Sequence, residues 1–126
     1  MPVLTQPPTL GDVLKFELNP SYTRETVTLL AGASYPVGAV LGRITASGLY
    51  KLATSGGSDG AQTAAAVLLT AVDASAADTL GVVIARGPAI VSKSALVFDA
   101  TVDDAAKTAT KHGQLAALGI VPRDTA

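Results

Sequence analysis

The 126-residue sequence contains no cysteine and no tryptophan, and it has a single histidine. Without cysteine there are no disulfides and no thiolate metal sites. One histidine cannot form a multi-histidine metal centre or a histidine cluster that senses pH. His112 is the sole candidate general base, but it lies in a polar segment with no serine or acid at a motif spacing. We therefore expect a solvated surface histidine, no enzyme activity, no cofactor and no metal site.

Charge is also scarce. Charged residues make up 15% of the chain, against roughly 25% in ordinary globular domains. The net charge is −1 and no basic run is present, so nucleic acid is not an expected partner. No apolar run reaches the roughly 18 residues that a membrane span needs, and we expect neither a signal peptide nor a membrane partner.

The scarcity of charge bears on assembly. Hydrophobic residues account for 48% of the chain although aromatic residues account for only 4%. A small protein of this kind exposes more apolar surface than suits a monomer, which favours an oligomer or a docked subunit. The alternative is that alanine raises the hydrophobic count without adding much burial.

Short apolar runs predict a mainly β protein of one domain. The runs Ala64–Leu69 and Leu80–Ala85 are bounded by turn residues, which is typical of buried strands. The polar connection Asp73–Asp78 is too short for a crossover helix, so the two strands should be antiparallel neighbours. Further strands are expected at Gly11–Leu18, Glu25–Leu30, Pro36–Thr45 in a hairpin with Leu49–Leu52, Ile90–Val91 and Leu96–Phe98.

A single helix is expected near the C-terminus, over Asp103–Leu118. Asp103 or Asp104 can cap its start, where free amides favour an anion. Gly119 suits the left-handed position that follows a helix end, whereas Gly113 weakens the helix interior. Small residues predict a face that packs closely on a sheet: Ala106, Ala109, Gly113 and Ala117.

The N-terminal segment reads differently from the rest. Three prolines within residues 1–8 resist regular structure and indicate an extended arm. In Gly11–Leu18 the alternation predicts Val13, Lys15 and Glu17 on one face and Leu14, Phe16 and Leu18 on the other. Such a strand either adds to the sheet of another chain or packs on its own domain, and both alternatives stay open. We place an extended arm at residues 1–24 and a compact β-rich domain at residues 25–126, with a core formed by Val27–Val91 and the final helix.

Several motifs, taken in order, resemble one protein family. They are GDVLKFE, SYTRETVTL, VLGRITASGLY, DGAQTAAAVLL, DASAAD, VVIARGPA and QLAALGIVPR, and they cover most of the chain from Gly11 to Arg123. This pattern resembles the lambda-type head decoration proteins of tailed bacteriophages. The resemblance implies a small β-clip-type barrel of short antiparallel strands with one C-terminal helix. It also implies homotrimers that bind the three-fold sites of an expanded head, on the outer surface of the virion capsid.

The same resemblance implies how the subunit attaches. The N-terminal arm would order against the major capsid protein and add to its sheet. The capsid-binding residues would then be Val13, Leu14, Lys15, Phe16, Glu17 and Leu18, with Phe16 contributing most. Arg24, Arg43 and Arg86 lie beside apolar strands, so they either anchor an interface or are simply solvated.

A β-clip carbohydrate-binding or enzyme-associated module is the alternative function. That function needs a polar pocket with an aromatic ring for stacking. The chain offers only five aromatic residues, scattered along the sequence: Phe16, Tyr22, Tyr35, Tyr50 and Phe98.

Overall fold

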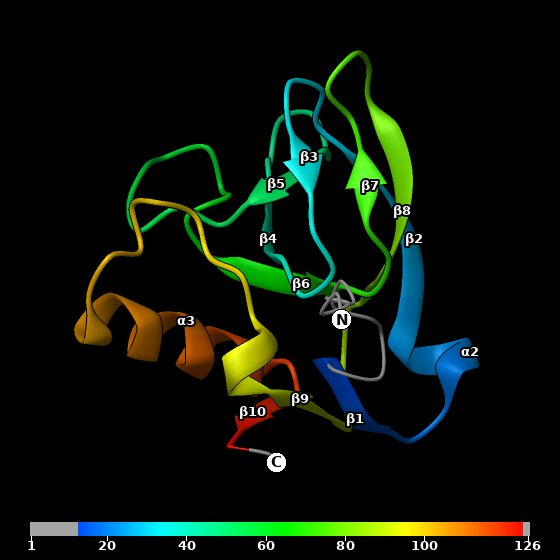
Figure 1. Ribbon diagram of the computed structural model, residues 1–126, viewed down its shortest axis with the longest axis vertical. Helices are drawn as coiled ribbons and strands as arrows, with labels where there is room; N and C mark the ends of the chain where they lie inside the picture. The colour runs from blue at the N-terminus through cyan, green and yellow to red at the C-terminus, as the bar shows by residue number, and fades with distance from the viewer. Residues whose placement is uncertain (1–12, 125–126) are drawn as a thin grey trace, which may run out of the picture.

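The computed structural model describes residues 13–124 and shows a closed five-stranded barrel above a smaller three-stranded sheet (Figure 1). The expected mainly β fold with one C-terminal helix is confirmed. The elements in chain order are β1 (Leu14–Glu17), α2 (Pro20–Thr23), β2 (Arg24–Leu29), β3 (Ser34–Tyr35), β4 (Val40–Arg43), β5 (Tyr50–Leu52), β6 (Ala64–Leu68), β7 (Val72–Asp73), β8 (Thr79–Ile84), β9 (Ala89–Ser92), the 3₁₀ helix Lys93–Ala95, α3 (Ala105–Ala117) and β10 (Ile120–Arg123).

The barrel strands follow the order β2-β5-β4-β6-β8 and close on β2. The predicted antiparallel pairing of β6 with β8 is confirmed, with Val67 opposite Ile84 and Leu68 opposite Val83. The predicted hairpin of β4 with β5 is also present. The polar connection between β6 and β8 contains β7, which pairs with β3 in a two-stranded ribbon at the far end of the barrel.

Two hydrophobic cores explain why some strands are apolar throughout. One core fills the barrel and includes Leu41, Leu68 and Val83. The other lies between the barrel, α3 and the three-stranded sheet, and includes Val40, Val67 and Ile84 of the same strands. Because adjacent residues of β4, β6 and β8 are buried on opposite faces there, these parts of the strands carry continuous apolar runs rather than an alternating pattern.

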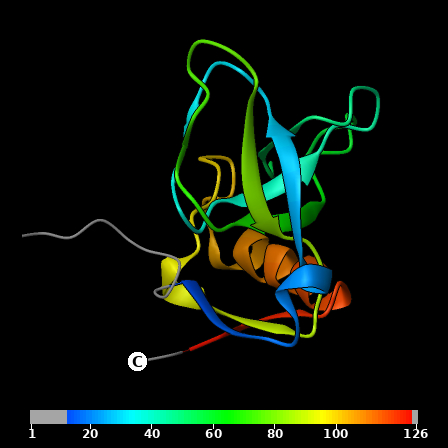
Figure 2. The ribbon, with the colours of Figure 1, turned by 90° about the vertical axis from the view of Figure 1, so that its right-hand side faces the viewer.

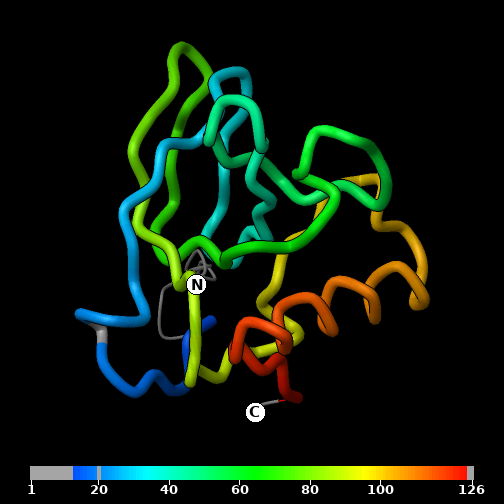
Figure 3. The backbone as a smooth tube through the Cα atoms, turned by 180° about the vertical axis from the view of Figure 1, so that it is seen from behind, coloured from blue at the N-terminus to red at the C-terminus, as the bar shows by residue number. Residues whose placement is uncertain are grey.

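The three-stranded sheet has the order β1-β9-β10 and lies at the opposite end from the β3–β7 ribbon (Figures 1 and 2). β1 pairs antiparallel with β9, whereas β10 pairs parallel with β9. Two parallel strands need a long crossover connection, and the segment with α3 supplies it, as the path in Figure 3 shows. The sequence did not predict β10, because four residues including a proline carry little strand signal.

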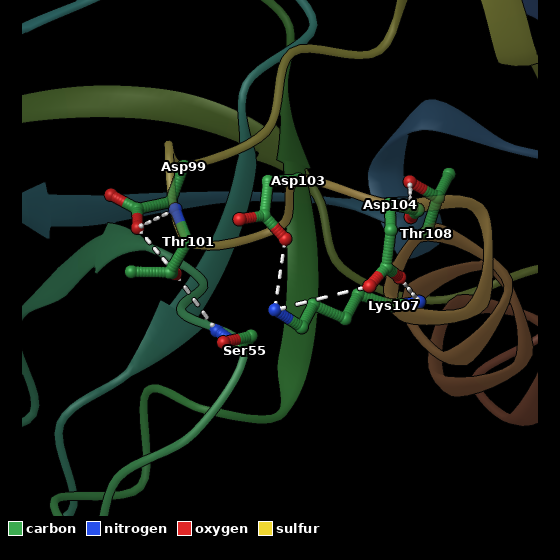
Figure 4. Close-up of polar contacts among 7 residues, drawn as sticks. All are labelled: Ser55, Asp99, Thr101, Asp103, Asp104, Lys107 and Thr108. Atoms are coloured by element: carbon green, nitrogen blue, oxygen red, sulfur yellow. Dashed lines mark hydrogen bonds and ion pairs between the residues drawn. The ribbon is translucent and has the colours of Figure 1, made fainter.

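α3 begins and ends as predicted. The Asp104 carboxylate caps it by accepting a hydrogen bond of 2.8 Å from the Lys107 backbone amide (Figure 4). Gly119 follows the helix with φ +82°. The helix continues unbroken through Gly113.

The predicted packing face of α3 is wrong. Its four small residues are exposed, and the buried residues are Lys111 and Leu115, which are four positions apart. Leu115 brings more apolar area to the core than alanine or glycine can. Lys111 is accommodated because its ammonium group finds two oxygen acceptors, Gln62 O and Gln114 Oε1.

Two other expectations are corrected. Residues Leu96–Phe98 form no strand; Val97 makes only an isolated bridge to Ala39 after the 3₁₀ helix. The alternation expected from Val13 to Leu18 is interrupted, because the register between β1 and β9 shifts between Leu14 and Phe16. Val13 is fully buried and belongs to the core, so Val27–Val91 and the helix do not form the core alone.

Candidate interaction surface

The described part of the predicted capsid-binding segment is an edge strand of its own domain. β1 pairs only with β9, with Leu14 opposite Val91 and Phe16 opposite Ile90. Leu14 packs against the core, whereas Phe16 is 49% exposed and Leu18 65% exposed. Residues 1–12, which include the proline-rich arm, lie outside the described residues. The intramolecular alternative for β1 is therefore what the structure shows, and attachment to another chain is a proposal.

Glu17 and Arg24 fasten the end of β1 to the start of β2. Arg24 Nε donates to Glu17 Oε1 at 2.9 Å, and the Thr23 hydroxyl donates to Glu17 Oε2 at 2.7 Å. The Glu17 side chain is only 9% exposed. The hydrogen bond from Arg24 holds the pKa of this carboxyl below its ordinary 4.5, although burial opposes the shift. Arg24 therefore forms an ion pair with a nearly buried carboxylate of the same chain.

Arg86 makes a second link of the same kind. Its guanidinium donates to the Tyr22 carbonyl oxygen and pairs with the Glu25 carboxylate. It also lies 5.3 Å from the centre of the Tyr22 ring, a cation–π distance. Arg43 instead is exposed on β4 and takes part in none of the salt bridges found within residues 13–124. The three arginines thus do not gather in one site.

The cavities do not favour a carbohydrate site. A cavity of about 220 Å³ is lined by Lys51, Asp99 and Thr54 among others, with Tyr35 as its one aromatic residue. The Tyr35 ring is only 3% exposed, and its hydroxyl donates to the Leu30 carbonyl oxygen at 2.8 Å. It offers no open ring face on which a sugar could stack.

His112 is not the solvated residue that the sequence suggested. Its Nε2 atom is buried and has no hydrogen-bond partner within the described chain. Its ring packs against Phe98 with centres 5.8 Å apart, and burial, followed by the charge of Lys93, lowers the pKa of the imidazole. No acid or hydroxyl is hydrogen-bonded to it, so the geometry of a catalytic base is not assembled there.

A polar cluster lies where the loop after β5 meets the segment before α3 (Figure 4). The Ser55 amide donates to Thr101 Oγ1 at 3.0 Å, and Thr101 donates to Asp99. Lys107 pairs with Asp103 at 2.8 Å. In this cluster the polar groups bond to one another and so order the loops. Across residues 13–124, no group of three or more His, Cys, Asp or Glu side chains could hold a metal ion.

Comparison with known families now decides what the chain is. The family model described as bacteriophage lambda head decoration protein D matches residues 3–120, nearly the whole chain. The chain belongs to this family. The resemblance seen in the sequence is confirmed, and decoration of a phage capsid is the role that membership implies. No curated protein matches the chain. No helix in the described part is long and apolar enough to cross a membrane.

Proposed function

We propose that this protein binds the expanded phage head as trimers at three-fold sites on its outer surface, where it cements neighbouring subunits of the major capsid protein. The family match over residues 3–120 carries this proposal. The geometry adds a candidate contact surface, because Phe16 and Leu18 are exposed at the edge of the three-stranded sheet.

Stabilisation would follow from mass action. A protein that binds only the expanded lattice lowers the free energy of that state by an amount set by its concentration and dissociation constant. Many bound copies, each touching neighbouring subunits, add these contributions over the shell. No chemical reaction is needed, in keeping with a structural role.

The N-terminal segment is the proposed attachment element. β1 has one unpaired edge among the described residues, and Phe16 on the strand and Leu18 just after it are exposed to solvent. An extended segment at a sheet edge can add main-chain hydrogen bonds to a partner while alternate side chains fill pockets. Because Val13 and β1 belong to the folded domain, we place the removable part of the arm at residues 1–12.

Cosedimentation with expanded heads that lack the decoration protein tests the attachment. We expect deletion of residues 1–12 to abolish binding and Phe16→Ser to weaken it by roughly tenfold or more, while both variants melt as the wild type does. Leu80→Ser is the matched control, since Leu80 is an apolar residue that is 65% exposed but lies on the barrel strand β8. Full occupancy by the truncated chain would show that attachment does not use residues 1–12.

A further inference from the structure

The three-stranded sheet carries an apolar row on the face that looks away from the core. Phe16 on β1 is in register with Ile90 on β9, and Ile90 is in register with Val121 on β10. Phe16 is 49% exposed, Val121 is 41% exposed and Ile90 is partly exposed. Three strands that are distant in sequence therefore present one continuous line of apolar side chains to solvent.

The other face of the same sheet is buried in the hydrophobic core. Ala89, Val91 and Ile120 are at most 2% exposed and pack in the core with Leu115 of α3. Because side chains alternate between the faces of a strand, burying these residues forces their neighbours Ile90 and Val121 outward. A sheet with both faces apolar is typical of one that is covered on both sides.

Charge is distributed unevenly along the molecule. Arg123 lies two residues after Val121, on the same face of the sheet. Lys93 follows β9 there, and among the described residues the sheet and the residue after it carry two acids, Asp124 and Glu17, of which Glu17 is bound by Arg24. At the opposite end of the barrel, the loop that begins at β7 carries Asp73 and Asp78. Asp73 accepts a hydrogen bond from the Ser75 amide and Asp78 accepts one from the Ala31 amide. Neither carboxylate forms a salt bridge among the described residues. Figures 1 and 2 show the sheet and this loop at opposite ends.

We infer that the row Phe16–Ile90–Val121 is a docking face that seats the subunit on an apolar patch of the capsid surface bordered by acidic side chains. The inference rests on the proposed function and names the face that meets the shell. Basic residues beside the row fit an acidic border on the partner, because complementary charge at the rim speeds and orients docking.

A second copy of this chain fits the face less well. In a face-to-face pair, the described residues of the sheet and its C-terminal end offer two acids, Asp124 and Glu17, and Glu17 is already bound by Arg24. The better match in charge is the acidic loop at the far end of the barrel. A contact between this loop of one molecule and the sheet of the next is heterologous. It closes into a ring only if the rotation between neighbours allows closure, and contacts at opposite ends of the molecule favour an open filament.

Binding of purified variants to expanded heads without decoration protein, measured at low and high ionic strength, tests this docking face. Val121→Asp should weaken binding by about tenfold or more, and Arg123→Glu should weaken it chiefly at low ionic strength. Leu80→Asp is the matched control, because it adds the same charge at an exposed aliphatic position on β8. All three variants should melt as the wild type does, since the replaced side chains are exposed.

The outcomes separate the possibilities. Loss of binding by Val121→Asp with binding retained by Leu80→Asp supports the docking face. Wild-type binding by both Val121→Asp and Arg123→Glu overturns it and leaves the proposed function intact. A changed oligomeric state of free Val121→Asp overturns it in favour of a second copy. If Val121→Asp destabilises the full chain but not the chain without residues 1–12, the chain's own N-terminus occupies the face. Failure of the wild-type protein to bind heads overturns both proposals.

Discussion

Glu17 is the residue whose protonation state should control how firmly β1 is held. The pKa of its carboxyl is lowered in the folded state by Arg24, so folding favours the ionised form. This contribution to stability is present above pH 4.5, the ordinary value, and is lost as the pH falls through the lowered pKa. We expect Glu17→Gln to lower the free energy of unfolding by about 1–2 kcal/mol at neutral pH. Chemical denaturation at a series of pH values measures this difference.

The comparison that isolates this effect uses the other arginine pair. Glu25 and Arg86 are 45% and 34% exposed, so solvent screens their attraction and Glu25→Gln should change stability by less than about 1 kcal/mol. The Glu17→Gln difference should disappear in acid, where the wild-type carboxyl is also neutral. A difference that persists unchanged to low pH would assign the effect to shape rather than charge.

Two lysines on α3 should respond to alkaline pH in opposite directions. Burial lowers the pKa of Lys111, so the unfolded state binds more protons up to pH 10.5 and stability rises with pH in that window. The hydrogen bond from Lys107 to Asp103 raises the pKa of Lys107, so its contribution is lost as the pH rises beyond 10.5. The free energy of unfolding of the wild type, minus that of each variant, can be measured by chemical denaturation at a series of alkaline pH values. This difference should rise with pH for Lys111→Met and fall with pH for Lys107→Met. Equal slopes would contradict the lowered pKa of Lys111.

At the level of elements, the start of α3 depends on one carboxylate. Asp104 accepts from the Lys107 amide, whereas Asp103 contacts only the Lys107 side chain among the described contacts. Asp104→Ala should cost about 1 kcal/mol, the usual value for a lost N-cap. Asp103→Ala, its matched control, should cost clearly less because that pair is exposed. Thermal melts of the two variants measure the difference, and equal losses would contradict the cap.

The elements also show what the sequence could predict. β6, β8 and α3 were predictable because apolar runs between turn residues, an aspartate cap and a closing glycine are local signals. β10 and the small ribbon of β3 and β7 were not, since each is too short to show a period and forms only through tertiary pairing. The packing face of α3 was missed because Lys111 is buried, and a lysine reads as solvated unless its acceptors are known.

The interaction surface was predictable only in part. Phe16 and Leu18 were named from the alternation of β1, and both are exposed. Ile90 and Val121 were not named in advance. They share a face with Phe16 only because the crossover containing α3 brings β10 back to pair in parallel with β9. Arg24 and Arg86 were expected either to anchor an interface or to be solvated, and their partners within the chain, Glu17 and Glu25, emerge only from the folded geometry.

At the scale of the whole molecule, the remaining prediction concerns self-assembly. Only 15% of the residues are charged, and Tyr22 is more than half exposed at a position away from the row on the three-stranded sheet. Apolar exposure outside the docking face suits a subunit that touches both the shell and its own copies. We expect the free protein to sediment with three times the mass of one chain, or to reach that state on the head. Val121→Asp should sediment as the wild type does, because the docking face is directed at the shell and not at a neighbour. A monomer in solution, together with single copies on the head that make no mutual contact, would contradict the trimer.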